Sequence, residues 1–452
     1  MPIDFDESFW ASRWTTQRGA RGDIKGIILA AGLGRRLDPL TARHLPKPLF
    51  PLGGKMAIAE IWVRRFIESG ITDVSMNVCV LAQTIKRYFG NGAKFGLNLQ
   101  FLDEQNPTGT LGGICKQALG RAAKSLGPND PLSNVPKFPG STVIAPSGDI
   151  VTDFGADLLE AMYAIHRSKG AAVTLVATRI PESRKKDFGT VILAGEERLS
   201  GPLNASGKIA GFLEKDPASP SNLSNASIYM IEMDLLEALD AFRTEARLDV
   251  ERPFYDFGKH AFPALLGKLP YVKLPREYPM WAIEYDGGWF DVGNKRDYIE
   301  VHKHLLDGRI SLPLTYEKLA WGYLGHNVSI DFSKVRIRPP VIIGNECVIE
   351  NGAILGPYAV IGDGWRIERG AEISNSVLWE RYSYFGEQGI EIPVYDRLRV
   401  DRHEVRPHVR IRDSIVPGGS IQEDIIEKTV DVQEDGQVAV LSIDYVPAGP
   451  RA

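Results

Sequence analysis

The sequence predicts an α/β domain with a doubly wound, Rossmann-like sheet, followed by a left-handed parallel β-helix of hexapeptide repeats. Two observations carry this prediction. Short apolar runs alternate with segments of helical spacing from residue 24 to about residue 303, as in a sheet covered by helices on both faces. Aliphatic residues then recur at every sixth position from 337 to 373, as in a solenoid with three short strands per coil.

Length and composition favour an ordinary globular protein with two or more domains. The 452 residues exceed what one hydrophobic core fills, and the net charge is only −4. Neither sign of charge dominates, so we expect neither nucleic acid nor a membrane as the main partner. The acidic first residues lack the basic start of a secretory signal, and no apolar run reaches about 20 residues, so we expect a cytoplasmic location.

In the first domain the strands and helices follow from apolar spacing. The wholly apolar run Gly26–Ala31 predicts a central strand that is buried on both faces. Residues Met56–Ser69 show helical spacing and end at Gly70, a suitable helix stop. The same reasoning predicts a helix over Ala82–Phe89 and strands over Asp73–Val80, Leu97–Leu102, Thr142–Ala145 and Ala171–Ala177.

The repeat of the C-terminal third has a period of six, which neither an α-helix nor a simple alternating strand produces. Its aliphatic positions are Ile337, Ile343, Ile349, Leu355, Ile361, Ile367 and Ile373. We expect an interruption near 380–407 to be a loop extruded from one coil, with the register resuming at Val409, Ile415 and Ile421.

The predicted division is an N-terminal arm (1–23), an α/β domain (24–303), a connection (304–334), the β-helix (335–435) and a tail (436–452). Trp10 and Trp14 of the arm are expected to dock on the body or on a neighbouring subunit.

The segment after the first strand has the composition of a phosphate-binding loop. It reads Ala-Ala-Gly-Leu-Gly-Arg-Arg-Leu-Asp-Pro-Leu-Thr from Ala30, and Leu-Pro-Lys-Pro-Leu follows from Leu45. Glycines let backbone N–H groups approach a polyphosphate, and basic residues neutralise it. A Walker loop would need Gly-Lys-Ser/Thr, and a dinucleotide fingerprint would need glycine at position 37, which is leucine.

The whole segment resembles the signature of the sugar-phosphate nucleotidyltransferase (NDP-sugar pyrophosphorylase) family. In motif it is closest to mannose-1-phosphate guanylyltransferase-like members with a C-terminal left-handed β-helix, and the resemblance covers about residues 24–303. It implies that Arg36 holds the β- and γ-phosphates of an NTP and that Lys47 contacts the α-phosphate. The remaining nucleotide-binding residues of this segment would be Ala30, Ala31, Gly32, Gly34 and Arg35. At Arg35 the family usually has threonine or serine.

The resemblance also implies a magnesium site. Asp149, in Ser-Gly-Asp, resembles the family's Asn-Gly-Asp metal ligand, and Asp291, in Trp-Phe-Asp-Val-Gly-Asn, resembles the second ligand. Phosphoryl transfer needs carboxylates from separate strand ends that converge on the phosphates. Either aspartate alone would be a turn or cap residue, but the pair in this order predicts Mg²⁺ binding.

A second set of residues resembles the family's sugar-phosphate site. Phe-Leu-Glu-Lys, ending at Lys215, resembles Phe-x-Glu-Lys-Pro, which assigns the sugar phosphate to Lys215 and a sugar hydroxyl to Glu214. Asn-Ala-Ser-Ile-Tyr resembles Asn-Ala-Gly-Ile-Tyr, which assigns sugar hydroxyls to Asn225. Ser227 replaces the usual glycine there, so we expect a slightly different backbone. Gly189 follows Phe188 as in the aromatic-Gly pair whose backbone approaches the sugar.

The segment from Glu104 to Thr110 bears on the nucleotide base. Glu104, Gly109 and Thr110 match the Glu-x-x-Pro-x-Gly-Thr element of guanylyl-transferring members, with Leu111 where alanine follows in that element. A carboxylate can accept hydrogen bonds from guanine N1–H and N2–H₂, whereas adenine and uracil offer no such donor pair. We therefore expect GTP, with dTTP, UTP or ATP as alternatives, and a sugar 1-phosphate as the second substrate.

Four further expectations concern the rest of the chain. A non-catalytic regulatory homologue is an alternative, although such members tend to lose residues of the Arg36, Lys47 or Asp149 type. A bifunctional enzyme with acyl transfer on the β-helix is another alternative, for which His403 and His408 would matter. The flat sides of a β-helix favour a homo-oligomer. His44 is expected either to be solvated or to touch a phosphate.

Overall fold

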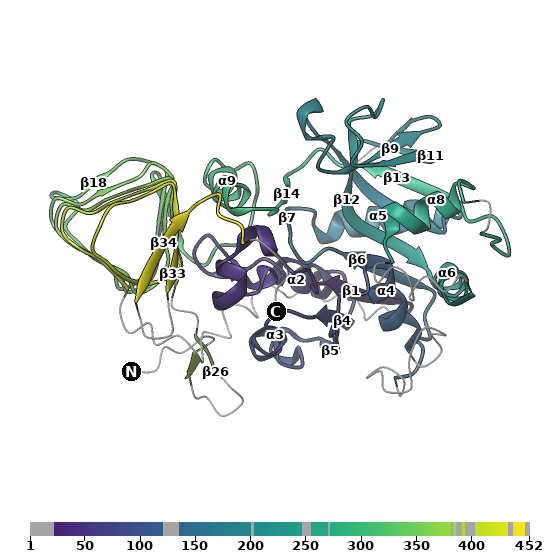
Figure 1. The fold of residues 1–452 in the computed structure, drawn as a ribbon, viewed down its shortest axis with the longest axis horizontal. Helices are drawn as coiled ribbons and strands as arrows, with labels where there is room; N and C mark the ends of the chain where they lie inside the picture. The colour runs from purple at the N-terminus through teal and green to yellow at the C-terminus, as the bar shows by residue number, and fades with distance from the viewer. Residues whose placement is uncertain are drawn as a thin grey trace.

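The computed structural model describes residues 22–120, 135–199, 203–245, 255–269, 272–380, 383–385, 391–393, 403–432 and 437–447. An α/β body and a prism of short stacked strands lie side by side (Figure 1). Trp10 and Trp14 of the predicted arm lie outside the described residues.

The α/β body is built on a ten-stranded mixed sheet (Figure 1). In spatial order its strands are β10 (Glu197–Arg198), β11 (Ala205–Glu214), β13 (Met280–Glu284), β8 (Val173–Arg179), β12 (Leu223–Glu232), β6 (Thr142–Pro146), β1 (Ile24–Leu29), β4 (Asp73–Val78) and β5 (Asn98–Asp103), with β9 (Gly189–Leu193) beside β11 and β12. Strands β6, β1, β4 and β5 run parallel, as expected. The sheet differs from a purely parallel one at β12, which is antiparallel to β6 and β8, and at β11, which is antiparallel to β13, β9 and β10. Apolar runs do not encode strand direction.

Helices cover both faces of this sheet, and two hydrophobic clusters pack against it. The described helices of eight or more residues are α2 (Glu60–Glu68), α3 (Ala82–Phe89), α4 (Thr110–Leu119), α5 (Ala156–Ser168), α6 (Met233–Glu245) and α9 (Lys295–Leu306). Helix α2 begins later than the predicted Met56, because β3 (Met56–Ala57) pairs with β2 (Pro51–Leu52). Phe66 of α2 is fully buried against Gly26 of β1, where an added Cβ would lie 2.7 Å from its ring.

The prism is a parallel β-helix with three sheets. The first face contains β16 (Gly322–Leu324), β19 (Val341–Ile343), β22 (Ala359–Ile361), β25 (Ser376–Leu378) and β30 (Ile415–Val416). The second contains β17 (Ser329–Ile330), β20 (Val348–Ile349), β23 (Arg366–Ile367), β28 (His403–Val405) and β31 (Gly419–Ile421). The third contains β18 (Arg336–Ile337), β21 (Ile354–Leu355), β24 (Glu372–Ser374), β29 (Arg410–Arg412) and β32 (Ile425–Ile426). Ile337 stacks on Leu355, which stacks on Ile373. The predicted six-residue repeat therefore forms the interior stack.

The coils begin and end beyond the regular repeat. Strand β16 already pairs with β19 inside the predicted connection 304–334. In the predicted interruption, β26 (Ser383–Phe385) and β27 (Glu391–Pro393) form an antiparallel hairpin, and Val405 of β28 then stacks beside Ile367, earlier than the predicted Val409. Strand β33 (Lys428–Val432) closes the helix and pairs antiparallel with β34 (Val438–Ser442).

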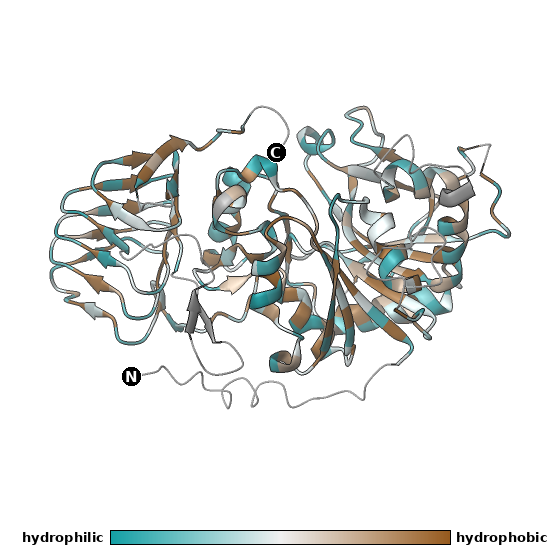
Figure 2. Cartoon of the chain, turned by 60° about the horizontal axis from the view of Figure 1, so that its bottom comes forward, coloured by the Kyte–Doolittle hydropathy of each residue, from teal (hydrophilic) through white to brown (hydrophobic). Residues whose placement is uncertain are grey.

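The two bodies share an apolar junction. Trp379, at the end of β25, is fully buried and packs edge-on against Phe50, with ring centroids 4.9 Å apart. Lys55 of the α/β body pairs with Asp363 of the β-helix at 3.1 Å. Hydrophobic residues follow the sheet strands and the coil interiors, while hydrophilic residues follow helix surfaces and outer turns (Figure 2). No helix among the described residues has the length and apolar character needed to cross a membrane.

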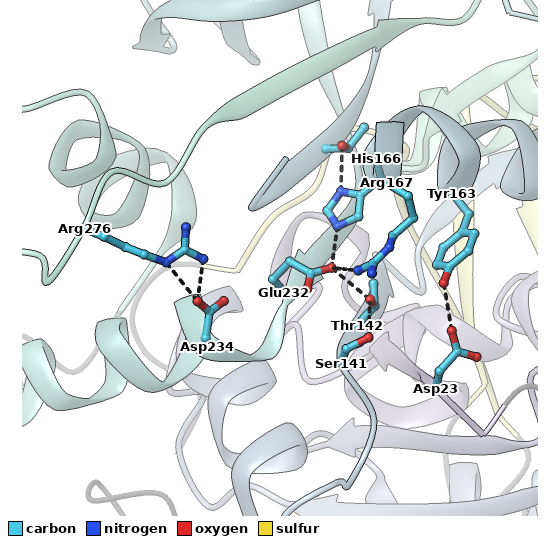
Figure 3. Close-up of polar contacts among 10 residues, drawn as sticks. Asp23, Ser141, Thr142, Tyr163, His166, Arg167, Glu232, Asp234 and Arg276 are labelled. Atoms are coloured by element: carbon cyan, nitrogen blue, oxygen red, sulfur yellow. Dashed lines mark hydrogen bonds and ion pairs between the residues drawn. The ribbon is translucent and has the colours of Figure 1, made fainter. Parts of the chain in front are cut away.

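A buried polar network fastens one edge of the sheet (Figure 3). His166 of α5 lies 2.8 Å from the Thr174 hydroxyl and 2.9 Å from the Glu232 carboxylate. Glu232 also accepts a hydrogen bond from Thr142 at 2.9 Å. Burial opposes ionisation of Glu232, but these donors outweigh burial and lower its pKa. Thr142 begins β6 and Glu232 ends β12. This network therefore lies at the opposite end of these strands from the loop that follows β6.

Candidate active site

The glycine-rich loop leaves β1 at the C-terminal edge of the sheet. The Ala30 amide donates to Asn77 Oδ1 at 2.8 Å, which ties the loop to the end of β4. Gly34 has a φ of 62°, and an added Cβ would lie 3.0 Å from Thr41. Thr41 in turn donates to the Gly34 carbonyl at 2.9 Å. Around Gly32 an added Cβ would meet nothing within 4 Å, so its backbone is open to a ligand.

The turn η1 (Arg35–Leu37) directs Arg36 toward the opposite strand connection. Arg36 is exposed, and its guanidinium nitrogens lie 3.3 and 3.4 Å from where a Cβ on Gly293 would sit. Gly293 follows β14 (Trp289–Asp291) by one residue, so Arg36 lies beside the segment that carries Asp291. Arg35 is partly exposed, and its surroundings give no reason for the arginine.

Lys47 lies between the two predicted metal ligands. Its Nζ is 2.5 Å from Asp149 Oδ2 and 3.3 Å from Asp291 Oδ1. Asp149 precedes β7 (Ile150–Thr152), whose Ile150 pairs with Asp291 of β14. This short antiparallel pair is what brings the two carboxylates together.

The electrostatics of this triad depend on burial and opposite charge. Lys47 is 8% exposed, which opposes its charged form, but Asp149 and Asp291 outweigh burial and raise its pKa. Burial acts against ionisation of Asp149 as well, but Lys47 and a hydrogen bond of 2.6 Å from the Ser147 hydroxyl lower its pKa. Asp149 therefore stays ionised, and both carboxylates converge on the Lys47 ammonium.

The donor set fits a hard divalent cation. Two aspartate carboxylates from separate segments already face a single positive charge. Among the described residues, no group of three or more His, Cys, Asp or Glu could hold a metal ion. Mg²⁺ is commonly bound through one or two carboxylates, with substrate phosphates and water completing its shell. Asp149 and Asp291 would be the protein ligands of such an ion.

The predicted sugar-phosphate residues form a second group beside the first. Lys215 has a positive φ of 54°, and its amide donates to the Phe188 carbonyl at 3.2 Å. An added Cβ on Gly189 would lie 2.7 Å from Glu214 Oε2, so glycine is what makes room for that carboxylate. Burial raises the pKa of Glu214, and the nearby Asp256 adds to the shift.

The side chain of Asn225 is fixed by contacts within an irregular part of β12. Its side-chain amide donates to the Tyr229 hydroxyl at 2.7 Å, and its Oδ1 accepts from the Ser227 amide at 3.0 Å. Ser227 has a φ of 58°, the left-handed conformation that glycine adopts without strain. The Trp289 indole donates to the Ala226 carbonyl at 3.0 Å, which ties this part of β12 to β14.

Glu104, which was expected to bind the nucleotide base, forms hydrogen bonds within its own segment, Glu104–Thr110. Its Oε1 accepts from Asn77 Nδ2 at 2.8 Å, and its Oε2 accepts from the Thr108 amide at 2.6 Å and hydroxyl at 3.0 Å. The side chain is buried, and Asn77 continues the connection to Ala30. Both carboxylate oxygens of Glu104 therefore accept hydrogen bonds from the protein. Through Asn77 and Thr108, Glu104 connects the glycine-rich loop to the Glu104–Thr110 segment.

Residues 255–260, which were not predicted to belong to the site, join the end of the Glu104–Thr110 segment to Glu214. The amides of Leu111 and Gly112 donate to the Tyr255 carbonyl. Thr110 Oγ1 lies 3.3 Å from Asp256 Oδ2. Asp256 also caps the turn that contains Gly258, which leaves room for Glu214. In the sequence, Asp256 before Phe257 and Gly258 indicates only an N-cap of a helical turn. It does not indicate the contacts of Asp256 with Thr110 or Glu214.

The sheet edge thus presents an open glycine-rich loop, an exposed arginine and a buried lysine between two carboxylates, groups suited to binding phosphates and a metal ion. A family model described as nucleotidyl transferase matches residues 25–308. With this match, the chain belongs to the sugar-phosphate nucleotidyltransferase family, as the motifs predicted, and is a nucleotidyltransferase enzyme.

Similar proteins extend over most of the chain. It is 30% identical over 387 residues to a UTP–glucose-1-phosphate uridylyltransferase of Synechocystis sp., a match that covers 84% of the chain and 89% of the relative. It is 27% identical to a mannose-1-phosphate guanylyltransferase of Mycobacterium tuberculosis, with 78% and 84% covered. It is also 27% identical to the mannose-1-phosphate guanylyltransferase catalytic subunit beta of Danio rerio, with 87% and 98% covered.

Proposed function

We propose that this protein transfers a nucleotidyl group from GTP to a sugar 1-phosphate, with Mg²⁺, and releases pyrophosphate. The observation that carries this proposal is the position of Lys47 between Asp149 and Asp291, on the same loop system as Arg36. One lysine and two aspartates meet here beyond the C-terminal ends of the strands, where α/β proteins bind ligands.

The reaction is an in-line attack of a phosphate oxygen of the sugar 1-phosphate on the α-phosphorus of the nucleotide. The attacking oxygen is already anionic, so no general base is required. Positioning and charge neutralisation supply the rate. Arg36 binds the β- and γ-phosphates that leave as pyrophosphate, and Lys47 binds the α-phosphate. Asp149 and Asp291 would hold Mg²⁺, which would supply positive charge to neutralise the phosphates.

The acceptor site consists of Gly189, Glu214, Lys215 and Asn225. Lys215 neutralises the sugar phosphate, while Glu214 and Asn225 bind hydroxyl groups. Supporting this assignment, the Ser147 amide donates to the Ser227 carbonyl at 2.9 Å, which joins the Asp149 loop to the part of β12 that carries Asn225.

The choice of nucleotide rests on the motif and on the relatives. The Glu104–Thr110 segment matches guanylyl-transferring members, and two of the relatives above are guanylyltransferases. UTP is the second candidate because the Synechocystis relative is a uridylyltransferase. The bonds of Glu104 to Asn77 and Thr108 favour a role in which Glu104 holds the loop that meets the base. Gly109 and Thr110 then lie at the base.

A single panel tests the proposal. The purified protein is mixed with each NTP and each of several sugar 1-phosphates, and pyrophosphate release is measured with and without Mg²⁺. The expected result is turnover with GTP and one hexose 1-phosphate, dependent on Mg²⁺. Pyrophosphate release with UTP alone would identify UTP, and not GTP, as the nucleotide substrate. No release from any pair would refute the transferase assignment for this chain.

The β-helix is proposed to serve assembly. We propose that its coils are left-handed, that they pack against another copy in a cytoplasmic homo-oligomer, and that the chemistry resides in residues 24–303. The presence of Arg36, Lys47, Asp149 and Asp291 together supports catalysis over a purely regulatory role. Size-exclusion chromatography with light scattering tests the oligomer.

A further inference from the structure

A buried lysine at the start of α9 contacts the backbone of the phosphate loop. Lys295 is 1% exposed. Its Nζ donates to the Arg36 carbonyl at 3.2 Å and to the Asp38 carbonyl at 2.7 Å. Lys295 therefore fixes the backbone of the residue whose guanidinium lies beside Gly293. It contacts neither aspartate of the carboxylate pair in these bonds, so its role differs from that of Lys47.

The third acceptor of Lys295 comes from the C-terminal tail. Its Nζ donates to the Tyr445 carbonyl at 2.6 Å. After β34 the chain leaves the β-helix and runs back to the α/β body, beside the segment that follows β1 (Figure 1). Ile443 is 2% exposed, and its amide donates to the Glu427 carbonyl at 2.9 Å.

Two further contacts hold the same end of the β-helix to the same region. Arg296 makes a two-pronged ion pair with Asp444, at 2.7 and 2.6 Å. His44 Nε2 lies 3.3 Å from Asp431 Oδ1 of β33, and His44 is only 3% exposed. His44 is therefore neither solvated nor directed at a phosphate, contrary to expectation. The phosphate segment is bordered by the C-terminal hairpin and tail through contacts at Lys295, Arg296 and His44.

We infer that Lys295 is a positioning residue that ties the NTP phosphate loop to the C-terminal tail, so that the nucleotide site is complete only when residues 443–445 are docked. This inference rests on the proposed function for the identity of the ligand. It assigns the end of the β-helix a part in substrate binding in addition to assembly.

Physical chemistry explains why this contact restrains the loop. A buried ammonium without hydrogen bonds is costly, and three carbonyl oxygens satisfy its three protons. Loss of the ammonium leaves those carbonyls without their donor, and charge-assisted bonds are stronger than neutral ones. Burial lowers the pKa of Lys295 to about 8, although the charges of Asp38 and Asp444 oppose the shift. The hydrogen bonds of the ammonium go to three backbone carbonyls.

The test compares two ways of breaking the contact. Lys295→Met removes the donor, and a chain that ends at Asp444 removes the Tyr445 carbonyl. Each is expected to raise the KM for the NTP about tenfold, as for the loss of a charge-assisted hydrogen bond, and to leave the KM for the sugar 1-phosphate within about twofold. Their combination should raise the NTP KM no further. A wild-type NTP KM in either single variant would overturn the inference.

Matched controls isolate the contact. A chain that ends at Pro447 keeps the Tyr445 carbonyl, and Lys303→Met removes a lysine of the same helix that pairs with Glu300 on the surface. Both should behave as wild type. An NTP KM raised tenfold in the Pro447 chain would assign the effect to later residues and contradict the inference.

Hydrogen exchange of the unliganded protein gives a readout that does not depend on the reaction. Backbone amides of residues 34–45 should exchange faster in Lys295→Met and in the chain that ends at Asp444, while those of β6 stay unchanged. Equal acceleration across the whole chain would show a general loss of stability and refute the positioning role. If no substrate pair gives turnover, the proposed function fails, but exchange still decides whether the tail holds the loop.

Discussion

The Ser147 amide donates a hydrogen bond of 2.9 Å to the Ser227 carbonyl. This bond joins the loop that carries Asp149 to the part of β12 that carries Asn225, beside the left-handed backbone of Ser227, where φ is 58°. The proposed metal ligand and the proposed sugar-binding residue therefore lie on segments joined by one backbone contact, about 80 residues apart in the sequence.

Substitutions at Ser227 test this contact. Ser227→Val places a β-branched side chain at positive φ, which should lower the free energy of unfolding by about 1–3 kcal/mol and reduce kcat/KM for the sugar 1-phosphate. Ser227→Gly adopts the conformation without strain and should retain activity. Chemical denaturation and initial rates measure both effects. A fully active, fully stable Ser227→Val would show that the backbone conformation is not required.

Removal of either partner of the central ion pair should stop the chemistry without unfolding the protein. Lys47→Ala or Asp149→Ala is expected to lower kcat by at least roughly 100-fold, as for the loss of a group that stabilises transition-state charge. The fold should survive because the Asp149 and Asp291 side chains remain 30% and 25% exposed. Pyrophosphate release and circular dichroism measure the two outcomes.

The control for these variants is Lys86→Met, which breaks an ion pair with Asp103 that is far less buried. It should turn over at the wild-type rate. Near-normal turnover in Lys47→Ala or Asp149→Ala would remove the basis of the assignment.

The sequence could predict the features that repeat or that combine several residue types at fixed spacing. The six-residue period of Ile343, Ile349 and Leu355 specifies an interior stack because each sixth side chain faces inward, and these residues are all buried. The central strand near Gly26 followed from its unbroken apolar run. Asp149 and Asp291 were paired through their motifs, and the structure brings them to one lysine.

Other features depend on contacts between distant segments, which spacing does not encode. Lys295 has the appearance of an ordinary lysine at a helix start, and only the return of the tail gives it a third acceptor. His44 was expected to be solvated or to touch a phosphate, but the β-helix buries it against Trp379, with ring centroids 6.4 Å apart. The antiparallel direction of β12 and the bonds made by Glu104 are likewise properties of the folded chain.

Glu104 should affect all nucleotides alike if it acts through its loop. Glu104→Gln keeps the shape but weakens the bonds to Asn77 and Thr108, and a loss of about 1–2 kcal/mol corresponds to a rise of roughly 5- to 30-fold in KM. The expected result is an equal rise for GTP and for any second nucleotide that the enzyme accepts. A rise for GTP alone would show instead that the carboxylate binds guanine directly.

Glu214 should set the acid limb of the pH profile for the sugar 1-phosphate. Burial and Asp256 hold its pKa above the ordinary 4.5, so its ionised form, which accepts hydrogen bonds from hydroxyl groups, is lost at a higher pH than usual. Asp256→Asn removes the neighbouring negative charge and should shift this limb of kcat/KM to lower pH. Glu214→Gln should abolish the limb. An unchanged limb in both variants would exclude Glu214 from sugar binding.

His302 should make stability depend on pH below neutrality. Burial lowers its pKa to about 4 from 6.5, against hydrogen bonds to the Tyr298 and Pro51 carbonyls. Between these values the unfolded chain binds the proton and the folded chain does not, so stability is complete above pH 6.5 and falls as pH decreases toward 4. The difference corresponds to about 3 kcal/mol. Urea denaturation from pH 4 to 7 should show this slope in the wild type and a flatter slope in His302→Gln. Equal slopes would mean that other groups cause the acid sensitivity. Catalytic rates of His302→Gln at pH 7 should match the wild type, because His302 packs against Tyr298 in the core, with ring centroids 4.8 Å apart.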